Sequence, residues 1–321
     1  MHSSTPARPA PLLRRPPLRQ LGTAARAATL LCLAFSLLPQ PLSSQEPPDA
    51  PQHTVVQAIP KLPEHDFHLY DHPAWSHDGR KIALMVHDLK AENTSTIWIF
   101  YPGSGRLEQV TRADSVGMID AQPVWSPDDR QIAFASNRGG AINVFTVDAD
   151  GRNLRQRTRD LEDAFVWRAR PSWSPQGDNL VFSTKVEGNT DLYRLDLSTG
   201  ATTRLTTAPG VDETPRWAPD GSRILFVSDR SGTPTLYLLD PSSGEIQPFA
   251  TELSGSGWGH KCSPDGNWIA LVESASIQDW SSWLVSVRTG KVYPLPAPSP
   301  HGSPYATFTL LEPRWPQHPV C

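Results

Sequence analysis

One phrase recurs five times along the chain: a tryptophan, a tight turn and an alternating apolar run. The copies read HPAWSHDGRKIALMVHD from His72, QPVWSPDDRQIAFASNRGG from Gln122, RPSWSPQGDNLVFSTKVEG from Arg170, TPRWAPDGSRILFVSDRSG from Thr214 and HKCSPDGNWIALVESAS from His260. Their anchor residues, which lie 50, 48, 44 and 45 residues apart, are Trp75, Trp125, Trp173, Trp217 and Cys262. A fixed period in this range is typical of a propeller, whose four-stranded blade needs about 40–45 residues.

The second copy, residues 122–158, divides into four predicted strands joined by turns. These strands cover residues 122–126, 131–136, 142–148 and 153–158. The turn SPDD at residues 126–129 suits its sequence because proline presets φ and aspartate tolerates left-handed geometry. Pro123 stands at the start of its predicted strand, where a missing N–H costs least. The second strand is the most apolar, so we expect it to be buried on both faces.

A four-stranded meander of this size cannot bury both of its faces alone. Stacking the copies around an axis buries them against one another, and this predicts an all-β propeller of four-stranded antiparallel blades. The repeated tryptophan then acts as a structural wedge between neighbouring sheets. The Asp-Gly pairs recur in the same turn of three copies, so they too are interpreted as structural: Asp78-Gly79, Asp220-Gly221 and Asp265-Gly266.

The repeated P-x-W-S-P-D-G followed by I-A-F-x-S resembles the repeat of the TolB-type β-propeller, a WD-repeat-like family of bacterial exported proteins. The resemblance covers roughly residues 68–296. It implies a propeller, often of six blades, in an exported protein that works through protein contacts. The separate α/β domain that precedes the propeller in the family's namesake is not expected here, because only about 20 residues separate the predicted signal from the first repeat.

The sequence does not decide how the ring closes. Five repeats are complete, and a partial sixth is suggested by residues 311–316, where LEPRWP echoes TPRWAP at residues 214–219. A five-bladed ring would be closed by this last segment or by residues 55–59 near the start. A second alternative is a truncated version of a longer protein, whose missing part would carry the chemistry.

The first 45 residues differ from the rest of the chain. They hold five arginines and no acidic residue, and they include the apolar stretch AATLLCLAFSLL at residues 27–38. A basic region before a short apolar run is the pattern of a signal peptide. We therefore predict a signal peptide at 1–45, a linker or closing strand at 46–66 and the propeller at 67–321, in a periplasmic or secreted protein without direct membrane insertion after signal removal.

The net charge of the chain after signal removal argues against some classes of partner. The chain has 29 basic and 33 acidic residues, so loss of the five leader arginines leaves 24 against 33, a net charge near −9. An acidic domain without a basic stripe argues against nucleic acid as a partner. The two remaining cysteines, Cys262 and Cys321, form no zinc pattern and leave their pairing open.

The positions just before each P-x-W vary between copies and carry charges in four of them. In a propeller these positions open on one rim, so they predict a binding surface. The predicted ligand-binding residues form a funnel that is acidic in the first, second and fourth blades and basic in the third: Asp71, His72, Asp120, Arg168, Arg170, Asp212 and Glu213.

A metal site and a catalytic nucleophile are the alternatives to a binding rim. His65, Asp66, His68, Asp71 and His72 are metal-ligand types, but the other repeats have no matching cluster, so no metal and no cofactor is predicted. The chain has no G-x-S-x-G elbow, and no catalytic residue is predicted.

We predict a monomeric, non-enzymatic protein-binding or scaffolding module that binds an envelope or extracellular protein. The alternative is the propeller of an enzyme, either a prolyl oligopeptidase-like peptidase or a metal-dependent carbohydrate lyase.

Overall fold

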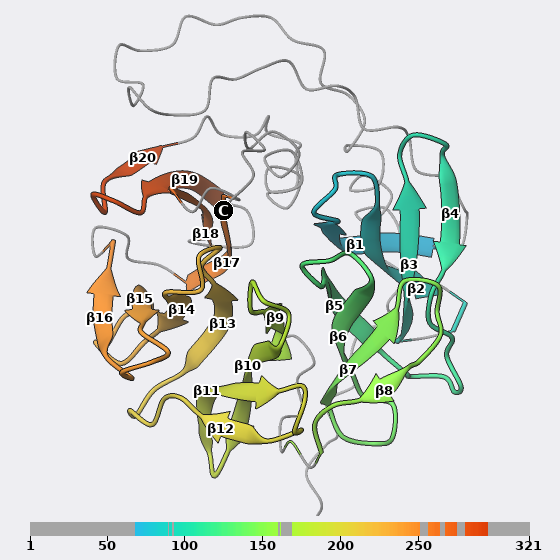
Figure 1. Cartoon of the computed structure of the whole chain (residues 1–321), viewed down its shortest axis with the longest axis horizontal. Helices are drawn as coiled ribbons and strands as arrows, with labels where there is room; N and C mark the ends of the chain where they lie inside the picture. The colour runs from blue at the N-terminus through green and yellow to red at the C-terminus, as the bar shows by residue number, and fades with distance from the viewer. Residues whose placement is uncertain are drawn as a thin grey trace, which may run out of the picture.

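The computed structural model describes residues 68–88, 90–91, 93–159, 161, 169–250, 256–263, 267–274 and 280–294. These residues form five four-stranded antiparallel sheets arranged as the blades of a β-propeller (Figure 1). The all-β fold predicted from the repeat is therefore confirmed. Within the described residues, no helix is long and apolar enough to cross a membrane.

Each blade is a meander of four strands that are consecutive in the sequence. Blade 1 comprises β1 (His68–Trp75), β2 (Ile82–Asp88), β3 (Thr94–Tyr101) and β4 (Arg106–Gln109). Blade 2 comprises β5 (Asp120–Trp125), β6 (Gln131–Ser136), β7 (Asn143–Asp148) and β8 (Arg155–Gln156). Blade 3 comprises β9 (Ser172–Trp173), β10 (Asn179–Val186), β11 (Asn189–Asp196) and β12 (Thr202–Arg204). Blade 4 comprises β13 (Asp212–Trp217), β14 (Ile224–Ser228), β15 (Thr235–Leu239) and β16 (Ile246–Phe249). Blade 5 comprises β17 (Ser256–Cys262), β18 (Trp268–Ser274), β19 (Trp280–Ser286) and β20 (Val292–Pro294).

The innermost strand differs from the prediction in one detail. In blade 2 it begins at Asp120, and Pro123 lies inside the strand at a shift of register between Ala121 and Val124. Gln122, the residue before the proline, has a φ of 56°. The proline is tolerated because a β-bulge already interrupts the ladder there, so its missing N–H breaks no further bond. The outermost strand is also shorter than predicted, since β8 covers only Arg155–Gln156.

The predicted tryptophan wedge is confirmed between the first three blades. The Trp125 side chain is 4% exposed, and its Nε1 donates to the carbonyl oxygen of Ala74 in blade 1 at 3.0 Å. Trp173 donates in the same way to the carbonyl oxygen of Val124 in blade 2, at 3.2 Å. Each ring thus fills the space between two sheets and satisfies its one polar group on the preceding inner strand.

In two of the three Asp-Gly pairs the aspartate accepts a hydrogen bond within its own turn, as predicted: Asp78 from the Ser76 hydroxyl at 2.6 Å and Asp220 from the Ser222 hydroxyl at 2.8 Å, whereas Asp265 lies outside the described residues. Asp128 accepts a hydrogen bond from the Ser126 hydroxyl at 2.6 Å, within its own turn. Asp129 does more than the turn requires, because its carboxylate accepts the backbone N–H groups of His77 and Asp78 of blade 1 at 2.7 and 2.8 Å. This side chain therefore joins blades 1 and 2 at the end of the propeller where the inner strands finish.

Several sequence-based expectations lie outside the described residues. They are the signal peptide, the candidate closing segments 55–59 and 311–316, His65, Asp66 and Cys321. They stay predictions.

Candidate functional site

The candidate site lies at the ends of the blades where the inner strands begin. In blades 2 and 4 it is built from the loops before β5 and β13 and from the turns after β6 and β14. We call residues 112–119, 137–140, 208–211 and 229–232 the upper rim. The antiparallel meander places the Asp128 and Asp129 turn at the opposite, lower end of the same blades.

Two buried ion pairs stand beneath the upper rim at equivalent positions. In blade 2 the Asp120 carboxylate is 0% exposed, and Arg138 donates to it through Nε at 3.2 Å and through Nη2 at 2.5 Å. In blade 4 the Arg230 guanidinium donates to Asp212 through Nη2 at 2.7 Å. Both guanidinium groups are stacked over aromatic rings of their own blade; Arg138, for example, lies 5.7 Å from the ring centre of Phe145. The pairs therefore fix the start of each inner strand to the turn that follows the second strand.

A second set of bonds fixes the rim loops themselves. In blade 2 the Asn137 side chain accepts the N–H of Ile119 at 2.7 Å and donates to the carbonyl oxygen of Gly117 at 2.9 Å. In blade 4 Asp229 accepts the N–H of Val211 at 2.6 Å. The loop residues Ile119 and Val211 also form parallel bridges to β3 and β11 of the preceding blades. Each loop is thus held from both blades that it connects.

The loop before β5 carries an exposed tip above this fixed base. Its base is tied to blade 1 because Thr94 Oγ1 accepts the N–H of Gly117 at 2.9 Å. Arg138 also donates to the carbonyl oxygen of Arg112 at 3.4 Å. At the tip, the Val116 side chain is 74% exposed, and its neighbours from 112 to 115 are exposed as well. An apolar side chain is therefore presented to solvent on a loop whose main chain is already ordered.

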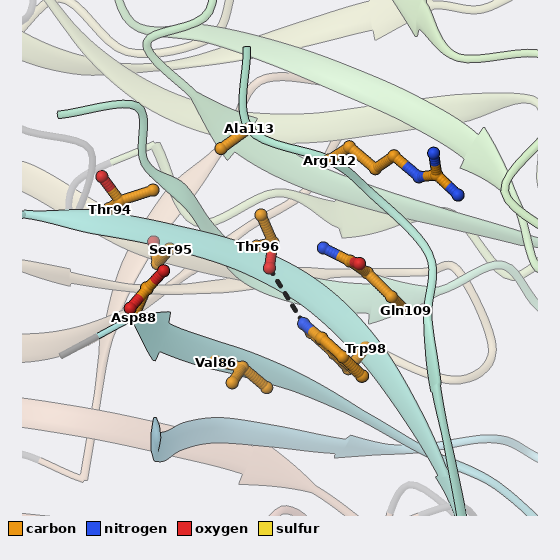
Figure 2. A pocket seen from close by; sticks show the side chains of 9 residues that line it. All are labelled: Val86, Asp88, Thr94, Ser95, Thr96, Trp98, Gln109, Arg112 and Ala113. Carbon is orange, nitrogen blue, oxygen red and sulfur yellow. Dashed lines mark hydrogen bonds between the residues drawn. The ribbon is translucent and has the colours of Figure 1, made fainter. Parts of the chain in front are cut away.

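A hollow of about 360 Å³ lies beside this loop on blade 1 (Figure 2). Its lining includes Asp88, Trp98 and Gln109 together with the short polar side chains of Thr94, Ser95 and Thr96. The Trp98 Nε1 donates to Thr96 Oγ1 at 2.9 Å, which leaves the ring to line the hollow. Arg112 extends away from Trp98 in Figure 2. The hollow offers an aromatic surface and hydroxyl, amide and carboxylate groups next to the exposed loop tip.

The residues predicted to bind a ligand fall into three groups. Asp120 and Asp212 lie directly beneath the upper rim, with their carboxylates buried against Arg138 and Arg230. His72 and Arg170 are the left-handed residues before the prolines of the inner strands, with φ of 46° and 24°, and they are partly buried, as is Glu213 in β13. The Asp71 side chain and Arg168 lie outside the described part.

Sequence reasoning missed the arginines that pair with these acids. Each arginine stands 18 residues after its aspartate, in Asp120–Arg138 and again in Asp212–Arg230. The same two copies share a carboxamide or carboxylate just before the arginine, at Asn137 and Asp229. Both recurrences stand in the compared repeats, which read SNR at residues 136–138 and SDR at residues 228–230.

The lower end of the propeller holds a second hollow, of about 640 Å³, between blades 2 and 3. Its carboxylates accept hydrogen bonds from their own blade. Asp148 accepts one from the Asn153 side chain and one from the Gln131 side chain, and these hydrogen bonds lower the Asp148 pKa. Burial opposes ionisation of Asp129, but hydrogen bonds from the His77 ring and backbone outweigh it and hold the Asp129 pKa below the usual value. Among the described side chains, no group of three His, Cys, Asp or Glu residues could hold a metal ion.

The fold and its repeated blades define the class of the chain as a β-propeller. A family model described as the TolB beta propeller domain, PD40, matches residues 156–292. The matched residues run from the end of blade 2 to the last strand of blade 5, and this part of the chain matches the TolB-type β-propeller that the repeated sequence resembles.

Two curated relatives match parts of this propeller. The Tol-Pal system protein TolB of Ruthia magnifica is 38% identical over 85 residues, which cover 26% of this chain and 19% of that protein. An uncharacterized peptidase, YuxL of Bacillus subtilis, is 29% identical over 118 residues, which cover 36% of this chain and 17% of that protein. The matches thus span less than a fifth of either relative.

Solved structures extend the likeness over most of the described blades. TolB from Acinetobacter baumannii superposes with a TM-score of 0.58 at 28% identity, covering 68% of this chain and 53% of that one. A puromycin hydrolase superposes at 0.57 and 19% identity, covering 74% of this chain and 40% of its own. An oligogalacturonate lyase from Vibrio parahaemolyticus superposes at 0.51 and 15% identity, covering 72% and 66%. At these two lower identities the likeness concerns the fold alone.

Proposed function

We propose that this chain is an exported, non-enzymatic propeller of the cell envelope, periplasmic or secreted, that binds another protein through its upper rim. The observation that carries the proposal is the loop at residues 112–119. It is bonded at its base to both blade 1 and blade 2, and it presents Val116 with 74% of its surface exposed. Ordering a loop before binding removes part of the entropy cost of association, so a fixed loop with an apolar tip suits recognition of a protein surface.

The composition around the tip fits the same role. Arg112 and Asp114 precede the apolar residue on the same loop, and the adjacent hollow adds the Trp98 ring and polar groups. Protein interfaces combine an apolar or aromatic centre with a polar rim, and Trp and Arg are enriched among the residues that contribute most to binding. The partner would place a protruding side chain in the hollow and cover Val116 with an apolar patch.

The predicted funnel residues enter this proposal with different roles. Asp120 and Asp212 would act through Arg138 and Arg230 by holding the rim in place, since their own carboxylates are buried. Asp71, His72, Arg168, Arg170 and Glu213 remain proposed contacts of the partner.

A second candidate is the propeller of a peptidase. The observation that favours it is the similarity to YuxL, which is described as a peptidase. In this reading the rim would face a catalytic domain rather than a separate protein. Identifying by mass spectrometry the protein that crosslinks to the rim distinguishes the two: a peptidase catalytic domain favours the second candidate, and a protein without one favours the first.

The proposal is tested by comparing two single variants as baits in an envelope extract. Val116→Glu places a charge at the exposed tip, and Leu154→Glu is the matched control. Leu154 is 41% exposed and precedes β8 at the lower end of the propeller. Chemical crosslinking followed by mass spectrometry should recover a protein with the wild type and with the control but not with Val116→Glu. Recovery of the same proteins by both variants would contradict binding at the upper rim.

A further inference from the structure

In blades 2 and 4 an arginine side chain packs on two aromatic rings at the upper end of the blade. The Arg138 guanidinium lies 5.9 and 5.7 Å from the ring centres of Phe134 and Phe145. Arg230 lies over the two aromatic rings of blade 4 in the same way, at 5.4 and 5.1 Å. Each cation also pairs with a buried carboxylate. Aromatic faces and a carboxylate together thus hold a guanidinium group in both blades.

Blade 1 keeps the aromatic position but has a carboxylate where those arginines stand. Trp98 is paired with the residue nine positions after the anchor tryptophan of its blade, as Phe145 is in blade 2. Asp88 stands 13 positions after the anchor tryptophan, where blades 2 and 4 have Arg138 and Arg230. Trp98 and Asp88 both line the hollow beside the upper-rim loop. The hollow therefore occupies the place at which the other two blades hold a guanidinium group.

Two more polar side chains of the hollow lie on the same face of blade 1. Thr96 precedes Trp98 by two residues on β3, and Gln109 is paired with Trp98 across the ladder, so all three share that face. In blade 3 the positions of Thr96 and Gln109 are taken by Asp191 and Arg204, which form an ion pair at 2.6 Å. Blades 2, 3 and 4 thus each supply an arginine to this face, whereas Thr96 and Gln109 of blade 1 are uncharged.

The charges that line the hollow favour a cation. Asp88 is the one carboxylate among its described lining residues, and Asp88 Oδ1 accepts the backbone N–H groups of Lys90 and Ala91 at 2.8 and 3.2 Å. A carboxylate has about four acceptor sites, so these two bonds do not exhaust its capacity. Of the described lining residues only Arg112 is a cation, and it extends away from Trp98 in Figure 2.

We infer that the hollow receives an arginine side chain of the partner protein, an inference that rests on the proposed function. The guanidinium stacks on the Trp98 ring and donates to Asp88, and the Gln109 carboxamide oxygen accepts a further N–H. Arginine suits the hollow better than lysine because its planar group stacks on aromatic rings and matches a carboxylate with two bonds. The volume of about 360 Å³ is at the lower end of the range of ligand pockets, about 300–1,000 Å³, as expected for a single side chain. The partner therefore presents an arginine beside the apolar patch that covers Val116.

Fluorine NMR of the full chain labelled with 5-fluorotryptophan tests the hollow without any partner protein. The Trp98 resonance is assigned by its loss in Trp98→Phe. Titration with N-acetylarginine amide should shift this resonance. The corresponding citrulline amide, which keeps the shape but carries no charge, should not shift it. An unmoved Trp98 resonance, or an equal shift with the lysine amide, would overturn the inference.

Substitution of the carboxylate tests which group holds the guanidinium. Asp88→Asn should weaken binding of the arginine amide at least about tenfold, because it removes a charge-assisted hydrogen bond. The asparagine oxygen can still accept the two backbone N–H groups, so the melting temperature should change little. Glu108→Gln is the matched control, since Glu108 is the neighbour of Gln109 on β4 and pairs with Arg106 on the opposite face. Equal affinity of the wild type and Asp88→Asn would overturn the assignment.

Photocrosslinking from Val116 separates this inference from the proposed function. If the partner places an arginine in the hollow, Asp88→Asn should reduce the yield of the crosslinked partner, and Glu108→Gln should not. A partner whose crosslink is unaffected by Asp88→Asn would overturn the arginine assignment and leave the upper rim as the binding surface. An arginine-specific shift of the Trp98 resonance without any crosslinked partner would contradict the proposed function but support a guanidinium site in the hollow.

Discussion

Replacing Arg138 with leucine would leave the Asp120 carboxylate buried without its cation. This carboxylate is 0% exposed and takes two bonds from the guanidinium group, whereas the arginine side chain is 11% exposed. Removing one partner of a buried ion pair costs about 3–5 kcal/mol because the other charge stays uncompensated. For a domain of 150–250 residues each kcal/mol corresponds to about 2–4 °C, so Arg138→Leu should lower the melting temperature by about 6–20 °C.

The reverse substitution should be milder. In Asp120→Leu the remaining arginine belongs to the rim turn at residues 137–140, so its guanidinium can turn toward water. Replacing both residues with leucine removes both charges, and a well-packed apolar pair is often neutral or stabilising relative to a buried ion pair. The double variant should therefore melt above Arg138→Leu. Melting is followed by circular dichroism at a single protein concentration, with Arg230→Leu as the replicate from blade 4. The reasoning is refuted if Arg138→Leu melts within about 1 °C of the wild type, or if the double variant melts at the temperature expected from adding the two single effects.

Three further predictions concern the scaffold. Trp125→Ala should lower the free energy of unfolding by about 3–5 kcal/mol in urea titrations, and Trp125→Phe by clearly less, because the ring fills the space between blades 1 and 2; equal losses would contradict the wedge. The Asp129 pKa is held below its usual 3.8, so its contribution to stability is complete at neutral pH and is lost as the pH falls through the folded-state pKa. Asp129→Asn should therefore reduce the loss of unfolding free energy between pH 7 and pH values below 3.8, and an unchanged pH profile would argue against this role. Gly151 has a φ of 81°, and an added Cβ would lie 2.9 Å from the carbonyl oxygen of Val110. Gly151→Ala should therefore lower the free energy of unfolding by more than about 1 kcal/mol. Gly103 has open space around it, so Gly103→Ala should lower the free energy of unfolding by less than about 0.5 kcal/mol. Equal costs for the two glycine variants in urea titrations would contradict the close approach.

The repeat spacing was sufficient to predict the fold because each element of the blade carries its own local signal. The Asp-Gly and Pro-Asp turns define where strands end, and the apolar run from Gln131 to Ser136 coincides with β6. The β-bulge at Gln122 was not predicted, because it depends on the register of β5 against β6 rather than on the residues of one strand. Local turn chemistry specifies where a strand stops, but not how its ladder is interrupted.

The end of the blade at which these two acids lie could be predicted, but the chemistry of their side chains could not. Asp120 and Asp212 were predicted to bind a ligand because they precede the recurring P-x-W of their repeats, and the structure places both at the start of an inner strand, directly beneath the upper rim. Their partners Arg138 and Arg230 come from the far end of the next strand, so no short motif reveals the pairing. A charged residue before an inner strand therefore indicates the rim without telling whether its charge faces a ligand or a neighbouring arginine.

The central claim is that a partner protein binds the upper rim, and site-specific photocrosslinking in the living cell tests it most directly. A photoreactive amino acid is placed at Val116 in one variant of the full chain and at Leu154 in another. The account predicts one discrete crosslinked band with the Val116 probe, identified by mass spectrometry as an envelope or extracellular protein, and its absence with the Leu154 probe. Crosslinks of equal yield at both positions, or a band only at Leu154, would contradict it.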